Sequence, residues 1–197
     1  DARGFLNLEL LPKGVDTRLF SPKKRSQPLR QSWGAREGTL VGLYVGRIAA
    51  EKNLPLLVKS FLEIQKRIPD FRGVFVGDGP KLAELKRDYP QFIYPGVLRG
   101  EDLAEHYASA DLFLFPSITE TFGNVTMEAM ASGLAVVAFD YAAAKQHIRN
   151  GENGFTAPFD DGDAYLELVL EAVNADLAEI RVNARASARK VRWKKVI

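Results

Sequence analysis

Cysteine is absent from the sequence, which excludes both disulfide bonds and thiolate metal sites and is compatible with a reducing cytosol. Long hydrophobic runs are absent as well, since apolar stretches such as LFLF and LAVVAF are far too short to span a bilayer. An excess of positive charge is also missing, because 27 Lys and Arg residues stand against 25 Asp and Glu residues. No overall basic field therefore indicates a nucleic-acid partner.

Histidine is scarce, and the sequence predicts no metal site. The two histidines, His106 and His147, have no partners at metal-ligand spacing. We predict that His106 is a surface residue of a helix, whereas the role of His147 is left open. The DGD stretch at 161–163 matches a three-residue metal-binding pattern, but it precedes a long helix, so we predict that Asp163 is a helix N-cap.

The residues that are present describe an ordinary globular protein. Of the 197 residues, 46% are hydrophobic and 26% are charged. Residues 21–38 are polar, basic and interrupted by Pro and Gly, which is typical of a connecting segment. We expect residues 1–38 to hold the end of a preceding domain and a linker, and residues 39–197 to form one domain with a truncated C-terminus. Because the sequence starts with Asp1 and not with Met, we expect it to be a fragment.

Apolar strands alternate with amphipathic helices from residue 40 onward. The predicted strands are 40–46, 72–77, 91–96, 111–116, 134–139 and 154–158; the predicted helices are 53–68, 80–88, 102–108, a segment from about 124, 145–150, and a segment from 163. The strands are continuously apolar rather than alternating, which indicates a parallel sheet covered on both faces. The sequence therefore predicts an α/β fold with a doubly wound parallel sheet.

Three polar loops that contain glycine follow predicted strands: GRIAAEKN (46–53), GDGP (77–80) and PSITETFGN (116–124). Ligands of open α/β sheets bind beyond the carboxyl ends of the strands, so we expect these loops to converge on one site. In the first loop, Gly46 allows close approach of a ligand, while Arg47 and Lys52 place two cations near a helix start. This pattern suits a phosphorylated ligand. The alternative is a solvated loop with a surface pair between Glu51 and Lys52.

The GDGP loop is more typical of a structural turn than of a ligand site. It is not a dinucleotide fingerprint, because no G-x-G-x-x-G follows the first strand, and the P-loop sequence is absent as well. A dehydrogenase and a P-loop kinase are therefore poor candidates.

The stretch ETFGNVTMEAM (120–130) places two carboxylates on either side of a turn. Glu120 precedes the turn, Gly123 lets the backbone lie against a ligand, and Glu128 lies about one turn into a helix predicted to begin near Asn124. Carboxylates only accept hydrogen bonds, and the hydroxyl pairs of sugars and ribose suit them well. The alternative interpretation makes Glu128 a partner of the helix dipole and Glu120 an ordinary loop acid.

The basic C-terminal stretch places Arg181, Arg185 and Arg189 on one helical face. We favour a solvated face, or a face that contacts a missing segment, over a membrane contact. Helices that lie on lipid usually carry larger apolar residues than the alanines found here.

Together these stretches resemble a known family. GRIAAEKN, GDGP and E-x-F-G-N-x-x-x-E followed by AMASG are similar to the nucleotide-sugar-binding half of a family four retaining glycosyltransferase. The upstream PKGVDTRLF (12–20) resembles the segment that introduces this half, so the resemblance covers residues 11–158. It implies the Rossmann-like C-terminal half of a GT-B fold, whose N-terminal acceptor half is missing from this chain.

The resemblance also implies roles for single residues. Arg47 and Lys52 would hold the donor diphosphate and, with Glu120 on the hydroxyls of the transferred sugar, form the catalytic set. Glu128 would bind the ribose hydroxyls. The remaining substrate-binding positions implied are Gly46 in the first loop, Leu98 and Arg99 near the base, and Phe122, Gly123, Asn124 and Val125 at the turn.

The sequence departs from the family pattern after Asp140, where a Gly-Gly pair and a Pro-Glu are common. Here these positions read Ala142-Ala143 and Lys145-Gln146, and Ala135 stands where proline is common. The small residues keep room for a ligand, but an acid is lost. The donor sugar is therefore left open, with a mannosyltransferase favoured.

The expected function is donor binding in a cytoplasmic, metal-independent hexosyltransferase that moves mannose or glucose from GDP-mannose or a UDP-sugar to a lipid or glycan acceptor. No separate cofactor is expected, and contact with the inner membrane face is an option for the full-length protein. This chain alone is expected to bind donor without turnover. Two alternatives remain, namely a GT-B sugar-nucleotide epimerase and a non-catalytic nucleotide-sugar-binding module.

Overall fold

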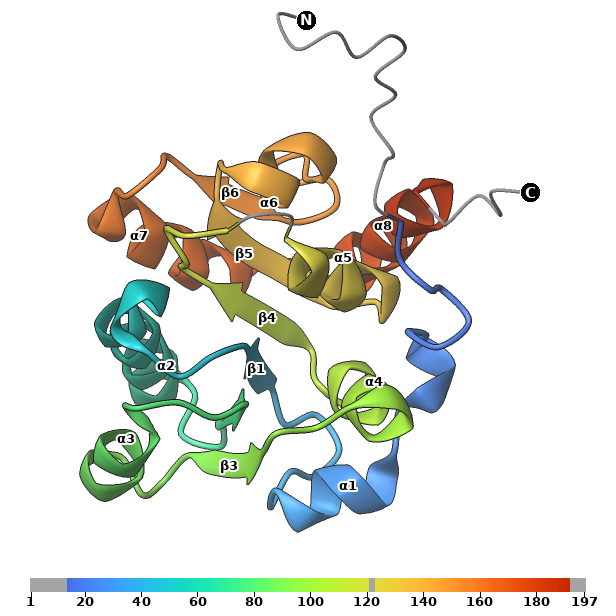
Figure 1. The fold of residues 1–197 in the computed structure, drawn as a ribbon. Coiled ribbons are helices and arrows are strands. Elements are labelled where there is room, and N and C mark those ends of the chain that lie inside the picture. The colour runs from blue at the N-terminus through green and yellow to red at the C-terminus, as the bar shows by residue number, and fades with distance from the viewer. Residues whose placement is uncertain (1–13, 121–122, 192–197) are drawn as a thin grey trace, which may run out of the picture.

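A single parallel sheet forms the centre of the molecule (Figure 1). The computed structural model describes residues 14–120 and 123–191. Its six strands lie in the order β3-β2-β1-β4-β5-β6, and every neighbouring pair is parallel. The strands are β1 (Val41–Val45), β2 (Arg72–Val76), β3 (Ile93–Gly96), β4 (Leu112–Phe115), β5 (Ala135–Phe139) and β6 (Phe155–Ala157). The predicted doubly wound α/β fold is confirmed.

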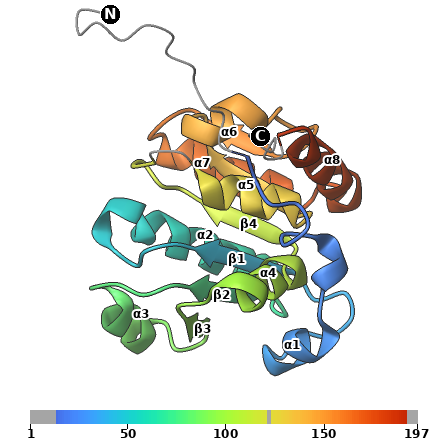
Figure 2. The ribbon, with the colours of Figure 1, turned by 45° about the vertical axis from the view of Figure 1, so that its right-hand side comes forward.

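Helices cover both faces of the sheet (Figure 2). The α-helices are α1 (Gln27–Ser32), α2 (Leu54–Arg67), α3 (Leu82–Asp88), α4 (Gly100–Ser109), α5 (Asn124–Ala131), α6 (Ala142–His147), α7 (Gly162–Ala172) and α8 (Leu177–Lys190); the 3-10 helices are η1 (Pro22–Lys24) and η2 (Ala50–Lys52). Helix α2 packs against α7, while α5 packs against α4 and α8. In the described part of the chain, no helix is both long and apolar enough to cross a membrane.

The apolar runs of the sequence become the buried strands. All residues of β1, β4 and β5 are buried, as the absence of alternation predicts. Gly42 in β1 and Gly73 in β2 make room for aromatic rings, because a Cβ at Gly73 would lie 2.6 Å from the ring of Phe61. Phe61 in turn packs edge-on against Phe71 at 5.4 Å and Phe75 at 5.0 Å between ring centroids. This aromatic cluster fixes α2 on the sheet.

Several local predictions are wrong. His106 is buried rather than on the surface, because its ring packs on Trp33 at 5.4 Å and its Nδ1 lies 2.7 Å from the Asp102 carbonyl oxygen. The N-cap of α7 is Asp161, which accepts a hydrogen bond from the Ala164 N–H, and Asp163 lies inside the helix. Helix α6 begins three residues before the predicted 145, and α3 begins at Leu82 rather than at 80.

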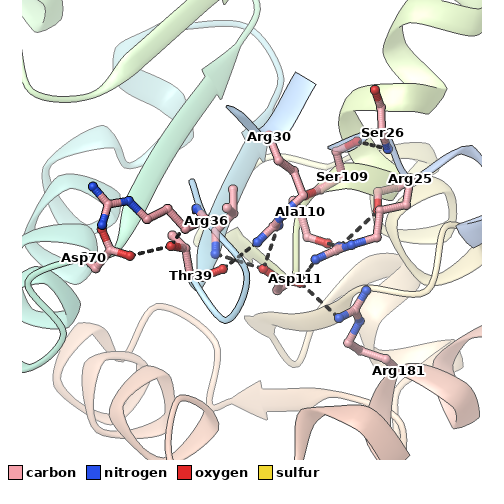
Figure 3. Close-up of polar contacts among 12 residues, drawn as sticks. Arg25, Ser26, Arg30, Arg36, Thr39, Asp70, Ser109, Ala110, Asp111 and Arg181 are labelled. Atoms are coloured by element: carbon pink, nitrogen blue, oxygen red, sulfur yellow. Dashed lines mark hydrogen bonds and ion pairs between the residues drawn. The ribbon is translucent and has the colours of Figure 1, made fainter. Parts of the chain in front are cut away.

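Three arginines converge on Asp111 at the amino end of β4 (Figure 3). The Asp111 carboxylate accepts hydrogen bonds from Arg25 (2.8 Å), Arg30 (3.1 Å), Arg181 (3.0 Å) and the Val41 N–H (3.0 Å). The guanidinium groups also donate to backbone carbonyls, for example from Arg30 to the Thr39 oxygen at 2.6 Å. We call these four side chains the Asp111 cluster. It ties the segment before β1 and helix α8 to the amino edge of the sheet.

The basic face of α8 is thus not simply solvated. Besides Arg181, Arg185 donates to the Phe20 and Thr17 carbonyl oxygens at 2.7 and 2.8 Å, while Arg189 is exposed. The segment predicted as a linker, 21–38, contains η1 and α1 and packs on the core through buried Trp33. The domain boundary at residue 38 stays a prediction, and the expected C-terminal truncation concerns residues outside the described part.

Candidate functional site

The candidate site lies at the carboxyl ends of β1 and β4, where the strand order reverses direction. Beyond β1 the chain continues to β2 on one side, and β4 lies on the other side. Such a switch point is where open α/β sheets bind ligands. A pocket of about 300 Å³ opens here between the loop that follows β1 and the loop that follows β4. The predicted residues that line it are Gly46, Arg47, Lys52, Glu120, Gly123, Asn124 and Val125.

Lys52 and Glu120 form an ion pair across this pocket. The Lys52 Nζ lies 2.7 Å from Glu120 Oε1, and both side chains are only 16% exposed. The same ammonium donates to the Thr119 carbonyl oxygen at 2.8 Å and to Ser117 Oγ at 3.3 Å. Lys52 is therefore held in one position beside a carboxylate. A charge pair so poorly exposed is weakly screened by salt.

Arg47 is far more exposed than Lys52. Its side chain is 66% exposed and forms an ion pair with Glu51 at 3.2 Å. An exposed pair of this kind is worth little, so the guanidinium is free to turn toward a ligand. The alternative surface pair between Glu51 and Lys52 is not the one formed. The Tyr44 hydroxyl donates to the Arg47 carbonyl oxygen at 2.9 Å, which fixes the backbone of this loop. Burial raises the pKa of Tyr44, so its hydroxyl stays protonated.

Glu128 lies on α5, one turn beyond the loop, and is half-buried. Its Oε2 accepts a hydrogen bond from the Tyr107 hydroxyl at 3.1 Å. Burial raises the pKa of Glu128, and the hydrogen bond from Tyr107 opposes this shift. Burial likewise raises the pKa of Tyr107 well above its usual value, so the tyrosine acts as a donor.

Gly123 forms the N-cap of α5 with a left-handed backbone at φ 66°, so the prediction that the helix begins near Asn124 is confirmed. A Cβ at Gly123 would lie 2.4 Å from the Ala143 Cβ, so the turn and α6 are in direct contact. Ala142 also adopts positive φ, at 48°, where the family pattern often has glycine. Glu120, Gly123, Ala142 and Ala143 border one narrow hollow. The turn and α6 therefore pack directly against each other, and room for a ligand at the small residues stays a prediction.

A second hollow of about 280 Å³ adjoins the first beside β1 and β2. Gly46, Arg47 and Leu98 line it, in agreement with a site that continues toward Leu98. Arg99 is exposed as the N-cap of α4 and does not line this hollow. Phe122 lies outside the described residues.

The GDGP loop supports the first loop sterically. A Cβ at Gly77 would lie 1.9 Å from the Gly46 carbonyl oxygen, and a Cβ at Gly79 would lie 2.3 Å from the Ile48 carbonyl oxygen. The Ile48 N–H donates to the Asp78 carbonyl oxygen at 2.8 Å. These contacts agree with the prediction of a structural turn, because both glycines are needed for backbone packing.

The described residues contain no group of three or more His, Asp or Glu side chains that could hold a metal ion. His147, at the end of α6, is half-buried, and burial lowers its pKa. Metal independence and the role of His147 both stay open at this point.

Sequence reasoning missed four residues of the site. Tyr44, Tyr107, Ser117 and Thr119 hold Arg47, Glu128 and Lys52 in place. Ser117 and Thr119 lie within the quoted loop, so their polarity was a usable signal. Tyr44 lies within an apolar strand and Tyr107 within the amphipathic helix α4, and nothing in either local pattern distinguishes them from core residues.

Comparison with known proteins places this chain in a family. The family model described as glycosyl transferases group 1 matches residues 39–175. A sulfoquinovosyl transferase (SQD2) of Arabidopsis thaliana is 41% identical over 163 residues, which cover 79% of this chain and 31% of the relative. A GDP-mannose-dependent alpha-mannosyltransferase of Mycobacterium tuberculosis is 34% identical over 185 residues, or 91% of this chain and 47% of the relative.

Solved structures share the fold. Anabaena HepE, solved in complex with UDP and glucose, superposes with a TM-score of 0.75 at 24% identity, covering 91% of this chain and 51% of that one. The chain thus spans about a third to a half of the length of the curated relatives it matches.

Proposed function

The chain belongs to the group 1 glycosyltransferases as a C-terminal family four domain of GT-B fold, and on that premise we propose that it binds the nucleoside diphosphate sugar of a retaining hexosyltransferase. The single observation that carries the proposal is the poorly exposed Lys52–Glu120 ion pair at the pocket, followed by a second carboxylate, Glu128, on the helix that begins at the pocket. Glu120 stands beside Lys52, and Glu128 lies one helical turn further on. This spacing suits a ligand with hydroxyls at both ends and phosphate between them.

The diphosphate is assigned to Arg47, Lys52 and the start of α5. When the bond between sugar and phosphate breaks, negative charge develops on the leaving diphosphate, and fixed cations stabilise it. Two unit charges about 4 Å apart near a protein surface interact by roughly 4 kcal/mol. Lys52 and Arg47 together can therefore supply the stabilisation that a metal ion gives in other enzymes, and we propose that the reaction is metal-independent.

Glu120 is assigned to the hydroxyls of the transferred sugar and Glu128 to those of the ribose. Leu98 borders the hollow that continues from Gly46, which supports a place for the base there. Arg99 is assigned no contact with the base, because its exposed side chain lies off that hollow.

We propose mannose as the donor sugar, carried by GDP. The named mannosyltransferase relative supports this choice, and the sulfoquinovosyl relative is the reason for testing UDP beside it. The acceptor is proposed to be a lipid or a glycan, and the whole enzyme to act in the cytoplasm at the inner membrane face.

Transfer requires more than this chain. The relatives are two to three times as long as the part matched here, and in GT-B enzymes the acceptor is held by the other half. Holding two reactants in line can account for roughly 7–11 kcal/mol of a barrier. We therefore propose that this chain alone binds donor and transfers no sugar to an acceptor.

The test combines ligand titration with one double variant. Thermal unfolding is followed with GDP, UDP and ADP, because a ligand at 100 times its dissociation constant adds about 2.7 kcal/mol to the stability of the folded state. GDP is expected to stabilise most. Arg47→Ala combined with Lys52→Ala should abolish the stabilisation and leave the circular dichroism spectrum unchanged. Stabilisation of the double variant equal to that of the parent chain would contradict the assigned phosphate site.

A further inference from the structure

Tyr107 is a fully buried side chain whose hydroxyl contacts Glu128 of the candidate site. It lies on α4, and its ring packs between Phe20 at 5.6 Å and Phe113 at 5.7 Å from centroid to centroid. Two aromatic neighbours and complete burial leave the ring a single position. The hydroxyl therefore lies at a fixed point, 3.1 Å from Glu128 Oε2.

A donor at a fixed point has a consequence for the carboxylate that it contacts. Glu128 is half-buried on α5, and its carboxyl group rotates about a broad, two-fold torsion unless something holds it. One hydrogen bond from Tyr107 to Oε2 selects an orientation, and the direction of the second oxygen is then set as well. Recognition of a diol depends on acceptor atoms held in a defined direction.

We propose that Tyr107 is a positioning residue that orients Glu128 toward the ribose diol, and thereby makes the site selective for ribonucleoside diphosphates. This inference rests on the proposed function, since it assigns Glu128 to the ribose. Tyr107 itself touches no ligand. Its effect passes entirely through Glu128.

The burial of both groups favours this role over that of a filler in the core. A tyrosine hydroxyl in a fully buried place costs stability unless it has a partner, and phenylalanine would fill the same space without that cost. The acceptor at Tyr107 is the carboxylate of Glu128 on α5, the helix whose first residues line the pocket. By contrast, the equally buried Tyr165 donates to the Val137 carbonyl oxygen at 3.1 Å, a bond that serves the backbone of β5.

Tyr165 therefore provides a matched control. Both Tyr107→Phe and Tyr165→Phe remove one buried hydroxyl and one hydrogen bond of 3.1 Å, but only the first bond ends on Glu128. The affinities of GDP and of 2′,3′-dideoxy-GDP are measured by calorimetry for the parent chain and both variants. Thermal unfolding of each variant shows how far it remains folded at the temperature of the titration.

The expected result is a change in selectivity. Tyr107→Phe should weaken GDP binding about tenfold, the size of one hydrogen bond to a charged group, and leave the dideoxy analogue nearly unaffected. Tyr165→Phe should leave the ratio of the two affinities unchanged. In a Glu128→Gln background, Tyr107→Phe should alter the ratio by less than it does in the parent chain.

Two results would overturn the inference, and they are distinguishable. If Tyr107→Phe weakens both ligands by the same factor, or changes neither, while the parent chain binds GDP more tightly than the analogue, then the tyrosine is structural and the proposed function stands. If the parent chain binds neither ligand, the proposed function itself fails and this inference fails with it.

Discussion

Glu120→Gln should strengthen the binding of a bare nucleoside diphosphate. In the ligand-free protein the Lys52 ammonium lies 2.7 Å from the Glu120 carboxylate, and both are largely screened from solvent at 16% exposure. A diphosphate that approaches Lys52 meets the negative charge of Glu120 at the same time. Glutamine keeps the shape and the acceptor oxygen of glutamate, so the substitution removes this repulsion and leaves Lys52 in place.

The size of the effect follows from the charges. Two unit charges 4 Å apart interact by about 1 kcal/mol in bulk water and by about 4 kcal/mol at the lower effective dielectric of a protein surface. A phosphate that took the place of Glu120 as the partner of Lys52 would lie farther from the carboxylate than the 2.7 Å that now separates the two side chains. We therefore expect a gain of about 1–2 kcal/mol in binding free energy, or roughly 5- to 30-fold in affinity for GDP.

The whole sugar nucleotide should respond differently. Glu120 is assigned to the hydroxyls of the transferred sugar, and glutamine accepts those hydrogen bonds less strongly than a carboxylate does. The affinity of GDP-mannose should consequently rise less than that of GDP, or fall. The ratio of the two affinities, measured by calorimetry at fixed low salt, reports the role of Glu120 separately from that of Lys52.

Glu51→Gln is the control, because Glu51 pairs with the other cation, Arg47, but is 41% exposed. Exposed pairs contribute little, so GDP affinity should change less than about threefold. Weaker GDP binding after Glu120→Gln, or an effect no larger than that of Glu51→Gln, would refute the idea that Lys52 is shared between the carboxylate and the phosphate.

Two further substitutions test the turn and its helix. Burial raises the pKa of Glu128, so the folded state holds its proton more tightly than the unfolded state, and stability falls as pH rises between the unfolded and the raised folded pKa. Glu128→Gln should therefore stabilise the ligand-free protein at pH 7 in urea unfolding, and the gain should vanish below about pH 4; a gain independent of pH would contradict this. Gly123→Ala should lower the free energy of unfolding by about 1–3 kcal/mol more than Gly96→Ala does. Both glycines have positive φ, but only a Cβ at Gly123 would meet another atom, the Ala143 Cβ at 2.4 Å. Equal losses in the two variants would show that the structure around Gly123 relaxes at no cost.

The fold was predictable because its signals are local. Continuous apolar runs such as AVVAF in β5 can hardly be anything but buried parallel strands, and the loops after them must then share one edge. The turn before α5 was predictable for the same reason, since Gly123 and the helix that follows Asn124 lie within a few residues of each other.

Features that depend on distant partners were out of reach. In the sequence His106 has the pattern of an ordinary polar helix residue, but in the fold Trp33 covers it, and β1, β2 and β3 lie between these two residues along the chain. The sequence offered the neighbouring Glu51 as an alternative partner of Lys52, whereas the folded chain pairs Lys52 with Glu120, 68 residues away. Likewise, Tyr107 meets Glu128 only because α4 and α5 pack side by side. Charge partners follow the topology rather than sequence spacing.

The Asp111 cluster has a consequence for the order in which the molecule assembles. Its carboxylate gathers Arg25 from 86 residues upstream and Arg181 from 70 residues downstream. Closing such long loops costs entropy before any contact rewards it, so we expect these bonds to form late in folding. Interactions absent from the transition state govern how fast a protein unfolds rather than how fast it folds. The cluster joins residues near both ends of the described chain to β4, so we expect its loss to speed unfolding more than it slows folding.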